Sequence, residues 1–248
     1  MSTIYILWMR QLKRYFRSRS RIIGALGQPL LFLIAFGYGF GSIFAAAGGG
    51  NYMNFLVPGI ISQSILFTAI SSGINLIWDR QFGFLKETLA APVSRLEIML
   101  GQALGGATVA TIQGAVVLVL SLFMGFSPAN WLLVPLAILA MFLLSLLFTL
   151  VGIAIASKME DFQGFQLIIN FLIMPLFFLS GALFPVSAMP KALAVVAQIN
   201  PVTYGVDMIR GFLSGTTHFG YTTDFAFVGG LTILLLVIGS YLFSRIEV

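Results

Sequence analysis

Charged residues divide this chain into polar islands separated by long, uncharged and mostly apolar runs. Four stretches of 57, 60, 29 and 20 residues contain no Asp, Glu, Lys or Arg: 22–78, 98–157, 162–190 and 225–244. A helix crosses about 30 Å of hydrocarbon with about 20 apolar residues, so each longer run holds two crossings and each shorter run holds one. The pattern predicts six transmembrane helices, approximately at 22–44, 55–77, 100–125, 132–156, 164–184 and 225–244.

Composition supports a membrane protein made of helices. The chain is 59% hydrophobic and 8% charged, whereas soluble domains carry about 25% charged residues. Backbone groups in lipid need internal partners, which only helices and closed barrels supply. Barrel strands alternate polar and apolar residues, and these uninterrupted apolar runs do not. The predicted fold class is therefore an all-α integral membrane protein.

Basic residues predict the orientation of the helices. With the N-terminus in the cytoplasm, eleven Lys and Arg residues fall inside: Arg10, Lys13, Arg14, Arg17, Arg19, Arg21, Arg80, Lys86, Arg95, Lys158 and Arg245. Only Lys191 and Arg210 fall outside. This asymmetry satisfies the positive-inside rule and places both termini in the cytoplasm. The net charge of +5 therefore indicates contact with membrane lipid rather than with nucleic acid.

The segment 3–20 has the pattern of an amphipathic helix that lies on the membrane surface. Its apolar face is formed at helical spacing by Ile4, Trp8, Leu12, Tyr15 and Phe16, and basic residues occupy the rest. Aromatic residues opposite basic ones are typical of interfacial helices. The alternative is a positively charged flank with no fold of its own.

The segment 185–224 is predicted to lie on the external side. It carries three prolines, and its amphipathic stretches 188–197 and 202–213 are each too short to cross. A residue that precedes proline avoids helical geometry, so the two helices should break at Asn200. We expect external or re-entrant helices, with Asp207 and Arg210 as an exposed surface pair.

The polar island at 79–97 predicts a short cytoplasmic helix between the second and third spans. Residues 84–90 allow about two helical turns before Pro92, and Ser94 with Glu97 fits a capping box that starts the next helix. Apolar side chains including Phe82 and Phe84 lie among charges. The segment is either a docking surface for a soluble partner or a connector on the lipid headgroups.

Two motifs resemble signatures of ABC-2 type permeases, the membrane subunits of a large class of ATP-driven exporters. The first follows the second span and reads Asp79-Arg80-Gln81-Phe82-Gly83-Phe84-Leu85-Lys86-Glu87, then Ala91-Pro92-Val93-Ser94-Arg95. The second follows the fifth span and reads Phe178-Leu179-Ser180-Gly181-Ala182-Leu183-Phe184-Pro185, then Pro190 and Ile199-Asn200-Pro201-Val202-Thr203-Tyr204. The resemblance covers nearly the whole chain and is nearest to bacterial drug-resistance and lipo-oligosaccharide export permeases.

The resemblance implies that the short cytoplasmic helix is a coupling helix, which seats in a groove of an ATPase subunit. The residues expected at this contact are Arg80, Phe82, Gly83, Phe84, Leu85, Lys86 and Glu87. At Gln81 the family often has an acidic residue, so a salt bridge there does not carry over. The turn at 158–161 would make a minor contact.

The chain has no Gly-x-x-x-x-Gly-Lys-Ser/Thr sequence and so lacks a P-loop for ATP. The resemblance then implies a transport subunit rather than an enzyme. ATP and Mg²⁺ would bind to two copies of a separate ATPase, which serve a homodimer of this chain. It also implies one ABC-2 domain over 1–248 in the bacterial cytoplasmic (inner) membrane, made of an interfacial helix (1–21), helices 1–5 (22–184), external helices (185–224) and helix 6 (225–248).

Polar side chains in the second span are candidates for lining a transport pathway. Ser64, Thr68, Ser71, Ser72 and Asn75 share one helical face, which in lipid must meet protein or water. Close helix packing explains the same pattern and is the default reading for small residues.

By resemblance, the second and fifth spans of two protomers face a central route. The fifth span would contribute Asn170, Met174 and Phe178 to it. Such a lining would suit an amphiphilic, lipid-linked or drug-like molecule, whereas each aromatic residue could equally face lipid.

Other functional classes find little support in the residues. The chain has no cysteine and a single histidine, so we expect no catalytic, cofactor-binding or metal-binding residues. The proposed spans hold no ionisable residue, which argues against a secondary carrier driven by protons or sodium. A passive membrane-structural protein remains as an alternative.

Overall fold

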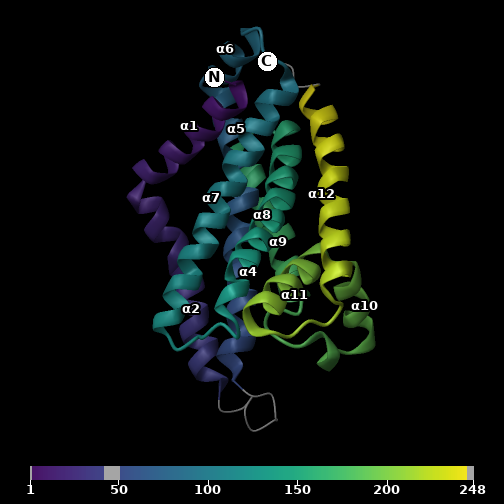
Figure 1. The fold of residues 1–248 in the computed structure, drawn as a ribbon. Coiled ribbons are helices and arrows are strands. Elements are labelled where there is room, and N and C mark those ends of the chain that lie inside the picture. Colours follow the sequence, from purple (N-terminus) through teal and green to yellow (C-terminus); the bar gives the residue numbers. More distant parts are fainter. Residues whose placement is uncertain (1, 42–50, 245–248) are drawn as a thin grey trace.

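A computed structural model describes residues 2–41 and 51–244 of the chain, and all regular structure within these ranges is helical (Figure 1). The α-helices are α1 (Thr3–Arg17), α2 (Arg19–Gly39), α4 (Tyr52–Ser71), α5 (Ile74–Gln81), α6 (Phe84–Ala90), α7 (Arg95–Phe123), α8 (Val134–Ser157), α9 (Phe162–Phe178), α10 (Lys191–Ile199), α11 (Pro201–Ser214) and α12 (Tyr221–Ser244). Short 3-10 turns occur at η1 (Trp131–Leu133) and η2 (Val186–Ala188). The predicted all-α fold is confirmed.

Five helical segments are long and apolar enough to cross a membrane, and there are six if the bent pair α10–α11 counts as one. These five are Ile22–Gly39, Tyr52–Gln81, Arg95–Phe123, Trp131–Ser157 and Tyr221–Phe243. The chain is therefore an all-α integral membrane protein. The expected extension of the first span to residue 44 lies outside the described residues.

The fifth predicted span is shorter than expected. It was predicted over 164–184, but α9 ends at Phe178 and measures 17 residues, or about 26 Å at 1.5 Å per residue. Residues 179–185 turn back, and the α10–α11 pair that follows is bent by 84°. This bend confirms the predicted break at Asn200 between two short helices, whereas their position on the external side stays a prediction.

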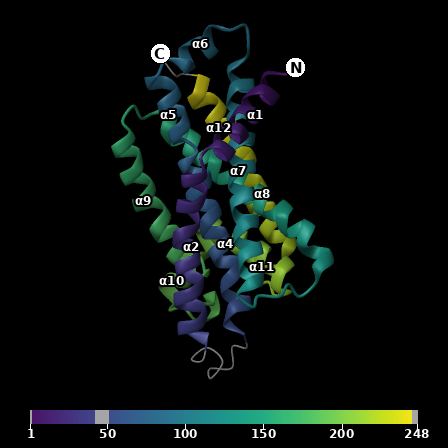
Figure 2. The same cartoon turned by 90° about the vertical axis from the view of Figure 1, so that its left-hand side faces the viewer.

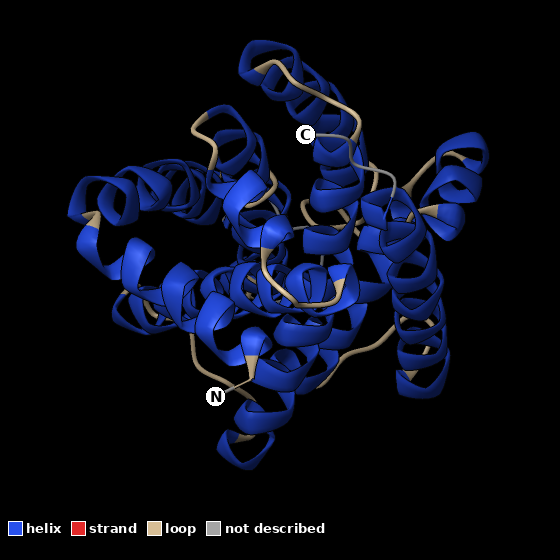
Figure 3. Cartoon of the chain, turned by 90° about the horizontal axis from the view of Figure 1, so that it is seen from above, coloured by secondary structure: helices blue, strands red, loops and turns tan. Residues whose placement is uncertain are grey.

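The helices α4, α7 and α8 form the centre of the bundle, and α12 and α11 pack against α8. Among the five long segments, Tyr52–Gln81 is the most enclosed, and Leu56, Ile60 and Ile61 of α4 are fully buried. Helix α9 stands apart from this centre on one side (Figure 2), and the view along the bundle shows α-helices throughout (Figure 3). The first turn of α1, the helix α6 and the end of α12 gather at one end of the bundle, here named the α6 end.

The N-terminal helix α1 packs along α7, which its sequence alone did not predict. Its buried residues are Leu7, Gln11 and Tyr15, whereas Phe16, expected on the apolar face, is exposed. A Cβ added at Gly101 or Gly105 of α7 would lie within 2.8 Å of these α1 side chains. The two glycines therefore form the groove that receives α1.

Candidate functional site

The short helix α6 lies between α5 and α7, as the sequence predicts. Gly83 starts it with φ of +80°, a left-handed conformation that favours glycine. Ser94 starts α7 with the predicted capping box: its side chain accepts from the Glu97 N–H, and the Glu97 carboxylate accepts from the Ser94 N–H. Both boundaries of the connection are therefore determined by local sequence.

Asp79 joins α5 to the N-terminal helix. Its carboxylate accepts hydrogen bonds from both terminal nitrogens of Arg10, at 2.8 and 2.7 Å. The Asp79 side chain is only 4% exposed, and a nitrogen of Arg14 lies 3.7 Å from it. The Arg10 guanidinium also lies 3.6 Å above the ring centre of Phe84. One arginine therefore connects α1, the end of α5 and the start of α6.

A second set of contacts holds the end of α5 to the turn after α8. Arg80 donates to the carbonyl oxygens of Ser157 and Met159, and Gln81 donates to that of Glu160. Arg80 was predicted as a docking residue. Gln81 occupies the position at which an acidic residue was expected from the resemblance to ABC-2 type permeases. The structure places both side chains in contacts within the chain that position the two turns relative to each other.

The other predicted docking residues divide between an outer and an inner face of α6. Phe82 is 79% exposed, and Lys86 and Glu87 are exposed beside it. Leu85 is buried and Phe84 packs against the core. The outer face therefore presents one aromatic ring among charges, and Trp78, 37% exposed, makes an edge contact with that ring.

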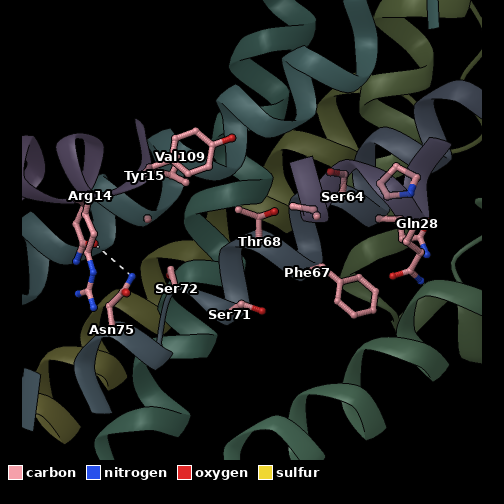
Figure 4. A pocket seen from close by; sticks show the side chains of 16 residues that line it. Arg14, Tyr15, Gln28, Ser64, Phe67, Thr68, Ser71, Ser72, Asn75 and Val109 are labelled. Carbon is pink, nitrogen blue, oxygen red and sulfur yellow. Dashed lines mark hydrogen bonds between the residues drawn. The ribbon is translucent and has the colours of Figure 1, made fainter. Parts of the chain in front are cut away.

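A cavity of about 460 Å³ lies between α1, α2, α4 and α7 (Figure 4). The polar face of the second span lines it, as the residues Ser64, Thr68, Ser71, Ser72 and Asn75. Asn75 donates to Gln11 of α1. Burial raises the pKa of the Tyr15 hydroxyl, which stays protonated and donates to Gln113. The five polar residues predicted on one face of the second span therefore line a single cavity.

Two side chains of this cavity have buried polar atoms without hydrogen-bond partners within the chain. Both amide atoms of Gln63 and the hydroxyl oxygen of Ser64 are in this state. Gln63 is 1% exposed. More than nine in ten buried polar groups of folded proteins have a partner, so Gln63 and Ser64 have hydrogen-bonding capacity that the rest of the chain does not use.

The candidates on the fifth span do not line this cavity. Asn170, Met174 and Phe178 are exposed on α9. Phe171, on the same helix, is 84% exposed. The two parts of the predicted pathway therefore do not meet within one chain.

The pair Asp207 and Arg210 was expected at the surface, and that expectation is wrong. Both side chains are buried in α11, and Arg210 is 8% exposed. Arg210 donates to the carbonyl oxygens of Phe55 and Gly181 and lies 4.0 Å from the ring centre of Phe55. Asp207 accepts from the backbone N–H groups of His218 and Phe219. Each charge is therefore engaged by backbone groups, those of α4 and the turn after α9 for Arg210 and those of the loop after α11 for Asp207.

The expectation that the spans contain no ionisable residue also needs correction. Helix α12 begins at Tyr221, four residues earlier than predicted, and so includes Asp224 in its first turn. The Asp224 side chain is fully buried, and neither carboxylate oxygen has a hydrogen-bond partner. The absence of ionisable groups therefore no longer argues against ion coupling, and the functional class has to be decided by other observations.

Comparison with known proteins gives a consistent result. The profile of a family described as "ABC-2 type transporter" matches residues 2–213. The transport permease ycf38 of Porphyra purpurea is 29% identical over 98% of this chain and 88% of its own length. Nodulation protein J of Rhizobium leguminosarum bv. trifolii is 28% identical over 85% of this chain and 78% of its own. The inner membrane transport permease YadH of Escherichia coli K12 is 28% identical over 84% and 80%.

Proposed function

Because the chain belongs to the ABC-2 type transporter family, we propose that this transport permease is the membrane subunit of an ATP-driven exporter. It moves an amphiphilic molecule outward across a bacterial cytoplasmic membrane, and a separate ATPase subunit hydrolyses ATP. Both termini and α6 face the cytoplasm. The ATPase docks on the outer face of α6, two copies of it serving two copies of this chain.

The observation that carries this proposal is the exposed ring of Phe82 on a well-anchored support. Arg10 holds α1 to Asp79 and covers Phe84, while Arg80 holds the turn after α8. A displacement of α6 would therefore also displace α1, α5 and the turn after α8. An exposed aromatic residue surrounded by charges is the composition that protein interfaces favour at their centre.

The docking proposal is tested by purifying the chain from its native membrane and assaying the co-purified protein for ATP hydrolysis. We expect Phe82→Ser to reduce co-purified ATPase by tenfold or more, the effect of an interface residue worth about 1.4 kcal/mol or more. Phe123→Ser is a matched control, because Phe123 is 85% exposed but lies at the opposite end of the bundle. Phe84 is less suitable, since it also supports Arg10.

Two outcomes would count against docking at α6. Equal ATPase recovery from the Phe82→Ser and Phe123→Ser variants would place the contact elsewhere. A pure preparation without ATPase would favour the secondary-carrier or passive alternatives, in which the segment 79–97 is a connector on lipid headgroups.

The exposed face of α9 supports the proposed homodimer. Phe171 and Leu167 are 84% and 71% exposed on a helix that makes few contacts with the rest of its chain. The chain has no native cysteine, so single cysteines report contacts between copies directly. We expect oxidation to link Phe171→Cys chains into dimers and to leave Ile233→Cys chains, with a similarly exposed residue on α12, unlinked. The opposite pattern would exclude α9 from the dimer interface.

A further inference from the structure

The cavity between α1, α2, α4 and α7 has one wall that can form hydrogen bonds and one that is apolar. Along the second span, Ser64, Thr68 and Ser71 of α4 and Asn75 of α5 offer hydroxyl and amide groups. Ala25 and Pro29 of α2, Phe67 of α4 and Val109 of α7 supply apolar surface. Its volume of about 460 Å³ falls in the range of small-molecule sites, about 300–1,000 Å³. This lining suits a molecule that is itself part polar and part apolar.

The ends of the cavity differ in charge. Figure 4 shows Arg14 and Asn75 at one end and Ser64 and Gln28 at the other. Among the residues that the structure describes, Arg14 is the only charged one that lines the cavity. It shares Asp79 with Arg10, which takes the two short hydrogen bonds of that carboxylate. The guanidinium of Arg14 makes this end of the cavity basic, which suits an anionic group.

The other end is uncharged and incomplete. Gln63 and Ser64 bring a buried amide and hydroxyl without partners into the cavity. A phosphate group at Arg14 would not reach them, because the eleven residues from Ser64 to Asn75 span about 16 Å at 1.5 Å per residue. A ligand that satisfies both ends must be elongated and carry neutral hydrogen-bonding groups away from its anionic head.

We propose that this cavity binds one elongated anionic amphiphile, with its phosphate or carboxylate head at Arg14 and hydroxyl or amide groups at Gln63 and Ser64. The amphiphile enters on the side where α1 is joined to α2, because Gly24 and Ala25 line the cavity there. The assignment of this amphiphile as the transported molecule rests on the proposed function. Its binding to the isolated chain does not.

Binding is tested with an amphiphilic probe on the full chain in nanodiscs of phosphatidylcholine. The probe is ω-hydroxydodecyl phosphate, whose terminal hydroxyl group can reach the Gln63 and Ser64 end, with a photoreactive diazirine in its alkyl chain; labelled peptides are mapped by mass spectrometry. We expect labelling of α2 and α4. Unlabelled dodecyl phosphate should compete, whereas inorganic phosphate and dodecyltrimethylammonium should not. Equal competition by inorganic phosphate would identify a free-anion site, and equal competition by the cation would remove the role of charge; either result overturns the proposal.

Paired variants separate the cavity from the rest of α2. A Cβ added at Gly24 or at Gly27 meets nothing within 4 Å, but only Gly24 lines the cavity. We expect Gly24→Phe to abolish labelling of α4 and Gly27→Phe to leave it unchanged. Equal labelling of both variants would show that the probe binds outside the cavity.

Smaller substitutions test the two ends without filling the space. We expect Arg14→Gln to weaken competition by dodecyl phosphate about tenfold, as for loss of one charge-assisted hydrogen bond. Arg17→Gln, which lies outside the cavity on the same helix, should have no effect. Ser64→Ala should weaken labelling and Ser62→Ala, whose hydroxyl donates to Pro58, should not. Equal effects within either pair would overturn the assignment of that end.

These experiments contain no ATPase, so their outcome is independent of docking at α6. Loss of ATPase co-purification with intact labelling would leave the binding site standing and remove the proposed exporter. If the ATPase co-purifies normally but Gly24→Phe does not reduce labelling of α4, the proposed exporter is retained and the proposed binding site is rejected.

Discussion

Arg10 and Asp79 form a two-pronged ion pair, with nitrogen–oxygen distances of 2.8 and 2.7 Å, between residues 69 positions apart in the chain. Asp79 is the last acidic residue before the proposed ATPase contact, and Arg10 belongs to the N-terminal helix. The pair therefore makes α1 part of the support of α6. The Asp79 carboxylate is buried, and the Arg10 side chain is about a third exposed. Loss of Arg10 would leave this buried negative charge poorly compensated, so the stability of the protein depends on the pair.

Removal of either member of the pair should destabilise the protein by about 1–3 kcal/mol, the range for hydrogen bonds to charged groups. We expect the variants Arg10→Gln and Asp79→Asn to be coupled, so that the double variant loses about 1 kcal/mol less than the sum of the single changes. The measurement is the free energy of unfolding in mixed micelles, from titration with dodecyl sulfate.

The neighbouring residue Arg17 gives the control for this cycle. It carries the same charge on the same helix and forms no ion pair with Asp79 in the structure. Arg17→Gln combined with Asp79→Asn should therefore be additive within about 0.5 kcal/mol. Additivity of Arg10→Gln with Asp79→Asn as well would show that the ion pair contributes nothing to stability.

Gly83 allows the turn between α5 and α6 because its φ of +80° disfavours residues with a Cβ. Gly83→Val should destabilise the protein by roughly 1–2 kcal/mol and reduce ATPase co-purification. Gly83→Asn should retain more of the stability and more of the co-purified ATPase than Gly83→Val. Gly125, with φ of +95° at the other end of α7, provides the matched control. Gly125→Val should carry a similar stability loss with normal co-purification. Normal co-purification of Gly83→Val would separate the turn geometry from docking.

The features that sequence predicted correctly are those determined by neighbouring residues. Uncharged apolar runs identify the long helices, since water-free surroundings exclude charges over about 20 residues. Residues 84–90 and the Ser94–Glu97 capping box were also predicted, because glycine, proline and serine act on the backbone within one turn. The polar face of α4 was predicted from its spacing, and the structure shows which helices enclose it.

The features that sequence missed depend on residues far apart in the chain. Arg210 was expected at the surface because its segment is amphipathic, yet its partners are the carbonyl groups of Phe55 and Gly181. The buried face of α1 was misjudged because Gly101 and Gly105 of α7 create its groove. For the contact between α1 and α5 the sequence did contain a signal. Asp79 is the one acidic residue among the first 86, and six basic residues precede it, so one of these is its expected partner.

The orientation of the bundle can be measured on the cysteine-free chain. Glu87 is exposed on α6, and Thr217 is exposed in the loop after α11 at the opposite end. If the α6 end faces the cytoplasm, a membrane-impermeant maleimide should label Thr217→Cys in intact cells. Glu87→Cys should be labelled only after the membrane is opened. Labelling of Glu87→Cys in intact cells would reverse the proposed orientation.

The contact of α8 with the end of α4 and the break before α5 gives a prediction about packing. A Cβ at Gly152 of α8 would lie 2.4 Å from the carbonyl oxygen of Ile70, and a Cβ at Gly73 would lie 2.4 Å from that of Gly152. Both obstacles are backbone atoms, so relief requires the helices to separate. Gly152→Ala should therefore destabilise the protein by about 1–3 kcal/mol, the range for overpacking.

The control for this packing prediction is Gly229→Ala in α12, where an added Cβ meets nothing within 4 Å. Alanine is favoured over glycine inside a helix by about 1 kcal/mol, so this variant should be as stable as the parent or more stable. Unfolding of both variants in mixed micelles compares the two glycines directly. If Gly152→Ala also proves neutral, the end of α4 and α8 can move apart without loss of stability, and the break at Ser72 and Gly73 is then a place where the second span bends rather than a rigid contact.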